Sequence, residues 1–148
     1  MSDPSSAPIA RILLVEDNPA DAELTRIALR KGKLKVDLDH VVDGVEALAF
    51  LRKQGDYEDA LTPDLVLLDL NLPRKSGHEV LAEVRTDPAL EHMPVVILTT
   101  SETEEDILES YRSKANCYVT KPLEAASFQQ IVGAVEEFWF TIVKLPKA

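Results

Sequence analysis

Short strand-like runs recur along the chain, and stretches with helical spacing of apolar and polar positions separate them. Short apolar runs are typical of buried strands, and their alternation with amphipathic helices is typical of a parallel sheet that is covered on both faces. The pattern therefore predicts five strands, at about Ile9–Val15, Lys35–Val41, Asp64–Leu68, Val95–Leu98 and Cys117–Val119.

Helix start signals fill the intervals between these runs. Asn18 is followed by Pro19, and this pair predicts a helix start because Asn caps exposed N–H groups and Pro has none to leave unsatisfied. Ser76 and Glu79 have the spacing of a capping box. The predicted helices begin near Asn18, Asp43, Ser76, Ser101 and Leu123, and they end near Gly32, Lys53, Arg85, Lys114 and beyond Phe140.

The order of these elements predicts one α/β domain. Right-handed crossovers between parallel strands give a flavodoxin-like (βα)5 fold, with a doubly wound five-stranded sheet in the order 2-1-3-4-5. Such a fold places its site at the carboxyl ends of the strands. We expect residues 1–8 to form a flexible arm, residues 9–142 the domain and residues 143–148 a tail.

Charge and composition narrow the classes of partner. The formal net charge of −10 argues against nucleic acid and against anionic membrane surfaces, because phosphate contacts need Lys and Arg. The single cysteine, Cys117, excludes an internal disulfide and fits a reducing compartment. The sequence also lacks a membrane-length apolar run and a signal-peptide core, so we expect a cytoplasmic protein.

Polar side chains follow four of the predicted strands. Glu16-Asp17, Asp69, Thr99 and Lys121 each stand where a strand ends. Taken singly, each has a structural explanation, because acids favour helix starts and Asp favours turns. The predicted strand order brings the acids together, and clustered carboxylates repel unless a cation is bound.

This donor set indicates a particular chemistry. Oxygen ligands with open positions suit Mg²⁺, which keeps some of its waters and recruits phosphate oxygens. Lys121 and Thr99 would face the same pocket, where an ammonium and a hydroxyl suit the oxygens of a phosphoryl group. The strand ends thus predict phosphoryl transfer to Asp69.

The chain resembles a response-regulator receiver domain of two-component signalling, of the CheY-like superfamily, across about residues 10–138. Asp69 and Thr99 are 30 residues apart, and Thr99 and Lys121 are 22 apart, and both spacings agree with that family. The residues that carry the resemblance are Glu16, Asp17, Asp69, Thr99, Tyr118, Lys121 and Pro122.

The resemblance implies a role for each matching residue. Asp69 would accept a phosphoryl group from a phosphohistidine on a sensor histidine kinase. Asp17, Asp69 and the backbone carbonyl of Asn71 would bind Mg²⁺ or Mn²⁺, with Glu16 acting through water. Thr99 and Tyr118 would switch the surface formed by the fourth helix, fifth strand and fifth helix, and Pro122 would follow a cis peptide bond. Such a protein is a phosphoacceptor and not an enzyme acting on other substrates.

The fifth predicted helix indicates how the protein would contact its partners. Phe138, Trp139 and Phe140 stand together, which is more aromatic surface than one buried stripe can absorb. We expect a homodimer or kinase interface at this end, and the alternative is a helix end wrapped by the tail. The aromatic end, the EDNPAD sequence at 16–21 and the long loop resemble single-domain regulators paired with phytochrome-type kinases.

Other hypotheses stay open at this point. A haloacid-dehalogenase-type phosphatase also uses a strand-end Asp with Mg²⁺, but it needs a second Asp where Asn71 stands. A flavodoxin-like electron carrier needs a phosphate loop where Glu16-Asp17 would repel phosphate. A binding-only receiver would never be phosphorylated. Two residues depart from common receivers, Glu16 in place of Asp and the bulky Thr100. The three histidines lack the spacing of metal ligands, and we interpret His40, His78 and His92 as ordinary surface or loop residues.

Overall fold

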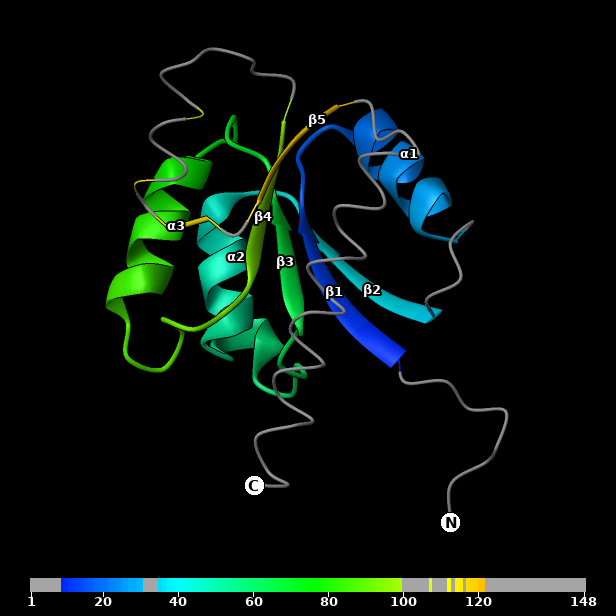
Figure 1. Cartoon of the computed structure of the whole chain (residues 1–148). Helices are drawn as coiled ribbons and strands as arrows, with labels where there is room; N and C mark the ends of the chain where they lie inside the picture. The colour runs from blue at the N-terminus through cyan, green and yellow to red at the C-terminus, as the bar shows by residue number, and fades with distance from the viewer. Residues whose placement is uncertain are drawn as a thin grey trace, which may run out of the picture.

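A parallel five-stranded sheet forms the centre of the protein (Figure 1). The computed structural model describes residues 9–30, 35–99, 107, 112, 114–115 and 117–121. The strands are β1 (Ile9–Val15), β2 (Lys35–Val41), β3 (Leu65–Leu68), β4 (Val95–Thr99) and β5 (Cys117–Thr120). Their order is β2-β1-β3-β4-β5 and every neighbouring pair is parallel, so the predicted fold class and strand order are confirmed.

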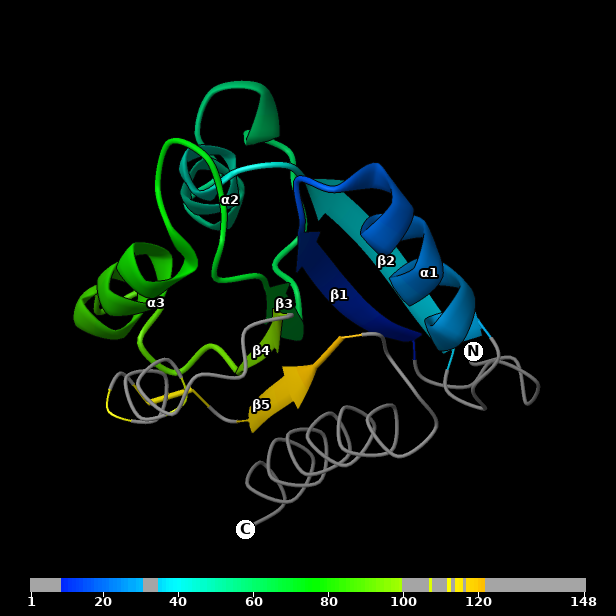
Figure 2. The same cartoon turned by 90° about the horizontal axis from the view of Figure 1, so that it is seen from above.

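Helices cover both faces of this sheet. The described helices are α1 (Pro19–Arg30), α2 (Gly44–Leu51) and α3 (Gly77–Thr86), and a short 3-10 helix, η1, spans Gly55–Tyr57. Figure 2 shows α1 on one side of the sheet and α2 with α3 on the other. The fourth and fifth predicted helices lie outside the described residues, apart from isolated positions of the fourth.

Two apolar layers, one on each face, hold the sheet to its helices. Strand side chains alternate between the faces, so Leu13 and Val15 join the layer under α2 and α3, whereas Ile12 and Leu14 join the layer under α1. The β3 run is buried at every position. Strands that are buried on both faces leave only their ends for polar chemistry.

The predicted N-terminal caps of α2 and α3 are present. Asp43 Oδ1 accepts a 2.8 Å hydrogen bond from the N–H of Glu46 at the start of α2. Ser76 and Glu79 form the predicted capping box of α3, each side chain accepting from the other's backbone N–H. Arg74 also donates to Asp43 Oδ2, from Nε at 2.9 Å and from Nη2 at 2.7 Å. This ion pair joins the start of α2 to the loop that follows β3.

The structure differs from the sequence prediction at some boundaries. The predicted loop after α2 contains η1, where the Tyr57 hydroxyl donates to Glu46 Oε1 at 2.6 Å and the ring packs 5.3 Å from that of Phe50. β3 begins one residue later than predicted, at Leu65, and the Asp64 carboxylate accepts a 2.8 Å hydrogen bond from the N–H of Arg11. β4 and β5 each extend one residue further than predicted.

The ends of the chain stay outside this description. The predicted arm at 1–8 and tail at 143–148 are not among the described residues, so the domain limits remain a prediction. Within the described part, no helix combines the length and the apolar character that crossing a bilayer requires.

Candidate functional site

The site lies where β1, β3 and β5 end. In the sheet, Val15 pairs with Leu68, so the residues that follow these strands, Glu16 and Asp69, emerge side by side. Backbone hydrogen bonds fix both positions, from the N–H of Glu16 to the Val41 carbonyl at 3.0 Å and from the N–H of Asp69 to the Val15 carbonyl at 3.1 Å. Strand pairing alone therefore brings the two carboxylates together.

Three carboxylates form a group with the chemistry of a metal site. One carboxylate oxygen from each of Glu16, Asp17 and Asp69 lies within 4.8 Å of the others. Glu16 and Asp69 are buried, whereas Asp17 is exposed. Hard divalent cations such as Mg²⁺ and Mn²⁺ favour carboxylate oxygens and retain water at an open side of the site. The residues present therefore fit the ion that the sequence predicted.

The electrostatics of Glu16 support this assignment. Burial, and to a smaller extent the charge of Asp69, raises the pKa of Glu16 to about 7, against the lowering effect of Lys121 and of the Asn18 N–H. The Asn18 N–H donates to Glu16 Oε2 at 3.2 Å. A bound cation would favour the charged form of this buried carboxyl, which lies beside a second carboxylate.

Lys121 is the cation that the chain itself supplies. Its side chain is 7% exposed, and its Nζ contacts Glu16, Asp21 at 3.0 Å and Asp69 at 3.2 Å. Burial on its own lowers the pKa of Lys121, but the hydrogen bonds to Glu16 and Asp21 and the charge of Asp69 outweigh burial and raise that pKa. Lys121 thus stays charged beside the Asp69 carboxylate.

The loop after β3 holds the Asp69 backbone tightly. The N–H of Asn71 donates to Asp69 Oδ1 at 3.3 Å, and the N–H of Gly77 donates to the Leu70 carbonyl at 3.0 Å. A Cβ at position 77 would lie 2.2 Å from the Asp69 carbonyl oxygen, so only glycine allows this approach. The start of α3 therefore packs directly against the backbone of Asp69.

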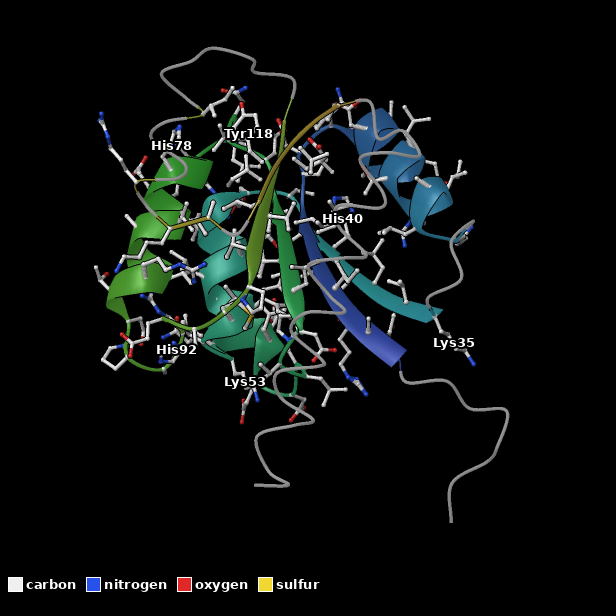
Figure 3. The ribbon with its side chains drawn as sticks, viewed as in Figure 1. Lys35, His40, Lys53, His78, His92 and Tyr118 are labelled. Carbon is white, nitrogen blue, oxygen red and sulfur yellow. The ribbon has the colours of Figure 1, made fainter. Side chains whose placement is uncertain are left out.

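The remaining predicted residues are described only in part. Tyr118 lies on β5, is partly buried and packs against the apolar layer under α2 and α3 (Figure 3). Thr99 ends β4, where its backbone pairs with Thr120, but its side chain lies outside the described residues. Pro122 and the predicted interface residues Phe138, Trp139 and Phe140 also lie outside them.

Two residues near the site were missed by the sequence prediction. Asp21, in the first turn of α1, reaches Lys121, and the sequence signal was the position of this acid one helical turn after Asp17. His40 is exposed, as predicted, but it lies on β2 and its Nε2 also donates to the Glu16 carbonyl at 2.7 Å, a contact that was not predicted (Figure 3). No sequence signal separates this histidine from other exposed ones.

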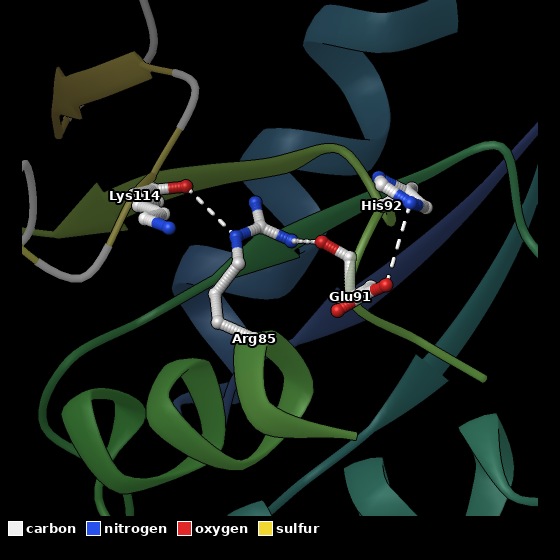
Figure 4. Close-up of a pocket in the computed structure, with 4 residues that line it drawn as sticks. All are labelled: Arg85, Glu91, His92 and Lys114. Atoms are coloured by element: carbon white, nitrogen blue, oxygen red, sulfur yellow. Dashed lines mark hydrogen bonds and ion pairs between the residues drawn. The ribbon is translucent and has the colours of Figure 1, made fainter. Parts of the chain in front are cut away.

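A hollow outside this site lies beside the C-terminal end of α3, and Figure 4 shows the four residues that line it. Arg85, Glu91, His92 and Lys114 line it, and residues 91–92 precede the start of β4. The Arg85 guanidinium donates to the Lys114 carbonyl at 2.9 Å and to the Glu91 and Met93 carbonyls at 3.2 and 2.6 Å. These bonds give Arg85 a structural role, tying the end of α3 to the segments before β4 and β5.

The comparisons with known proteins agree with this geometry. The family model described as "Response regulator receiver domain" matches residues 12–133. Response regulator Rcp1 of Synechocystis sp. (strain PCC 6803) is 46% identical over 148 residues, which cover the whole of both chains.

Solved structures extend this likeness. The Mn²⁺-bound form of Rcp1 superposes with a TM-score of 0.74 at 45% identity, covering 88% of this chain and 94% of that one. The phosphorylated cyanobacterial phytochrome response regulator RcpA superposes with a TM-score of 0.76 at 48% identity, covering 91% and 96%. The chain therefore belongs to the response regulator receiver domain family, whose members act as phosphoacceptor modules in two-component signalling.

Proposed function

We propose that Asp69 is the residue that accepts the phosphoryl group. The observation that carries this proposal is a buried Asp69 carboxylate with Lys121 Nζ at 3.2 Å and two further carboxylates in the same group. A nucleophilic oxygen, a fixed cation and a set of metal ligands are the parts that phosphoryl transfer needs.

The residues would divide the transfer step between them. An Asp69 carboxylate oxygen attacks phosphorus, an O–P bond forms, and the P–N bond of a phosphohistidine breaks with the electron pair leaving on nitrogen. Lys121 lies beside Asp69 Oδ2 and would stabilise negative charge on the transferring oxygens. The burial of Glu16 and Asp69 limits competing water around the reacting carboxylate.

We propose Mg²⁺ as the ion of this site, with Mn²⁺ as a substitute. Glu16, Asp17 and Asp69 would hold it, together with the backbone carbonyl of Asn71. The ion, when bound, supplies positive charge to the phosphoryl oxygens. The Mn²⁺-bound form of the relative Rcp1 supports a divalent ion in this family.

The proposed partner is a sensor histidine kinase of the phytochrome type. The similar structure RcpA is that of a cyanobacterial phytochrome response regulator, which supports this partner. On this proposal the protein works in the cytoplasm and catalyses only its own phosphorylation and dephosphorylation. Thr99 and Tyr118 would switch the signalling surface, and Phe138, Trp139 and Phe140 would form a homodimer interface.

One experiment tests the central proposal. The protein is incubated with acetyl phosphate and MgCl₂, and intact mass spectrometry follows the addition of one phosphoryl group. We expect labelling that EDTA abolishes, that base removes, and that is lost in Asp69→Asn. The matched control is Asp59→Asn, an exposed acid in the loop after η1, which should label like the wild type.

The opposite outcome has a clear meaning. An unlabelled wild type would favour a binding-only receiver over a phosphoacceptor. Labelling that persists in Asp69→Asn would place the acceptor at another residue.

A further inference from the structure

Asp21 contacts the lysine of the proposed site from a different element than the other acids. Its Oδ2 lies 3.0 Å from Lys121 Nζ, compared with 3.2 Å for Asp69 Oδ2. Asp21 belongs to the first turn of α1, whereas Glu16 and Asp69 follow strands. We propose that Asp21 is a positioning residue, which holds the Lys121 ammonium at the place where a phosphoryl group on Asp69 needs it. This inference rests on the proposed function.

The position of Asp21 has a simpler explanation, but this explanation does not account for the contact with Lys121. An acid in the first helical turn stabilises the helix dipole without touching any other side chain. The capping function of this turn is already filled by Asn18, whose Oδ1 accepts from the N–H of Ala20 at 2.9 Å and from that of Asp21 at 3.1 Å. The Asp21 carboxylate instead meets a lysine that is 100 residues away in the chain.

The hydrogen-bonding capacity of Lys121 shows why this contact matters. An ammonium has three N–H donors, and Lys121 has three carboxylate neighbours, Glu16, Asp21 and Asp69. Phosphorylation would convert one of them, Asp69, into an acyl phosphate. Glu16 belongs to the metal-ligand group, and Asp21 does not. Asp21 is therefore the neighbour that keeps its contact with Lys121 while the other two change partners.

A long lysine side chain gains most from such an anchor. Lys121 would otherwise follow whichever carboxylate or phosphoryl oxygen is present, because a lysine is a flexible point charge. Small misplacements of a catalytic group reduce the rate strongly. The negative charge of Asp21 would act in the other direction by repelling an anionic phosphodonor. If Asp21 positions Lys121, its removal lowers the labelling rate. If its charge only repels the donor, its removal raises that rate.

The test compares three variants by the rate of Mg²⁺-dependent labelling with acetyl phosphate. Asp21→Ala removes the anchor, and Asp21→Asn removes the charge but keeps an oxygen that accepts from Lys121. Glu23→Ala is the matched control on the same helix, because Glu23 is 59% exposed and pairs with Arg26 at 3.7 Å. Each rate is measured over a range of donor concentrations, and the affinity for Mn²⁺ is measured by calorimetry.

We expect the maximal rate of Asp21→Ala to fall by about tenfold or more, with little change in the donor concentration for half-maximal rate. Asp21→Asn should recover most of that loss, and Glu23→Ala should match the wild type. Mn²⁺ affinity should be similar in all four proteins. A merely structural role would lower the urea midpoint of Asp21→Ala without this recovery by Asn.

Several results would overturn the inference. A labelling rate of Asp21→Ala that equals or exceeds that of Glu23→Ala removes the positioning role, and so does a failure of Asn to restore the rate. If the wild type labels at Asp69 while Asp21→Ala is normal, only this inference fails. If the wild type does not label at all, the proposed function fails and this inference fails with it.

Discussion

Glu16 is the residue whose protonation depends most on its surroundings in the described site. Its carboxylate is almost fully buried, and the pKa of about 7 lies well above the ordinary value of 4.5. An acid with a raised pKa in the folded state binds its proton more tightly there than in the unfolded chain. The folded protein therefore loses stability as the pH rises from about 4.5 to 7, where the buried charge develops.

This effect predicts a pH dependence that one substitution should remove. In EDTA, the free energy of unfolding of the wild type should fall, relative to that of Glu16→Gln, by on the order of 1–3 kcal/mol between pH 5 and pH 8. Urea unfolding at each pH measures it, and the comparison cancels the titration of the three histidines. A constant difference between the two proteins would contradict the raised pKa. Saturating Mg²⁺ should reduce the dependence, because the ion stabilises the charged carboxylate.

At the residue scale, sequence predicted the parts of the site that strand ends determine. Glu16, Asp69 and Lys121 follow buried strands, so the sheet order alone brings them together. The contacts of Asp21 and His40 were missed because local structure alone is enough to explain why each residue stands at its position. An acid in a first turn and an exposed histidine on an edge strand are ordinary features, and only the fold shows that they contact Lys121 and the Glu16 carbonyl.

At the element scale, the connection from β3 to α3 couples the fold to the site. Gly77 is the first residue of α3, and the position that its missing Cβ would occupy is 2.2 Å from the Asp69 carbonyl oxygen and 2.7 Å from the Leu70 Cα. Neither neighbour is the flexible end of a side chain, so a methyl group would have to displace the backbone of Asp69. Overpacking of this kind costs about 1–3 kcal/mol.

Gly77→Ala should therefore reduce stability and metal affinity together. We expect a loss of about 1–3 kcal/mol in urea unfolding and a weaker Mn²⁺ affinity by calorimetry, because Asp69 moves with its backbone. Ser76→Ala is the control, since it removes the cap of α3 at about 1 kcal/mol without reaching Asp69. Equal Mn²⁺ affinities in Gly77→Ala and Ser76→Ala would show that the Asp69 position tolerates the added methyl group.

The elements themselves were predictable where local signals are strong. β1 and β2 match their predicted bounds, and the caps at Asp43 and Ser76 begin α2 and α3 as expected. The short helix η1 was not predicted, because the contact that holds it joins Tyr57 to Glu46 on the previous helix. Tertiary contacts of this kind leave no periodic pattern in a polar loop.

At the scale of the whole molecule, metal binding should report on folding. Glu16-Asp17 and Asp69 are far apart in sequence and form one group only because β1 pairs with β3. An ion that needs this group binds the folded state and not the unfolded chain, so it raises the free energy of unfolding. At an Mg²⁺ concentration ten times the dissociation constant, the increase should be about 1.4 kcal/mol.

Because the net charge is −10, added Mg²⁺ could also stabilise the protein by screening charge repulsion, and the measurement must separate this effect from binding. Any added salt screens repulsion between acidic groups, so urea unfolding in MgCl₂ is compared with NaCl at the same ionic strength and with EDTA. We expect Asp17→Asn to abolish the specific increase, because it removes one carboxylate of the metal-binding group. Asp17 is chosen because it is the exposed member of the group, so its replacement disturbs the buried pair least. Glu23→Gln removes one charge elsewhere on the surface and should keep the increase. If Mg²⁺ stabilises Asp17→Asn as much as the wild type, the ion acts by screening and not by binding at the ends of β1 and β3.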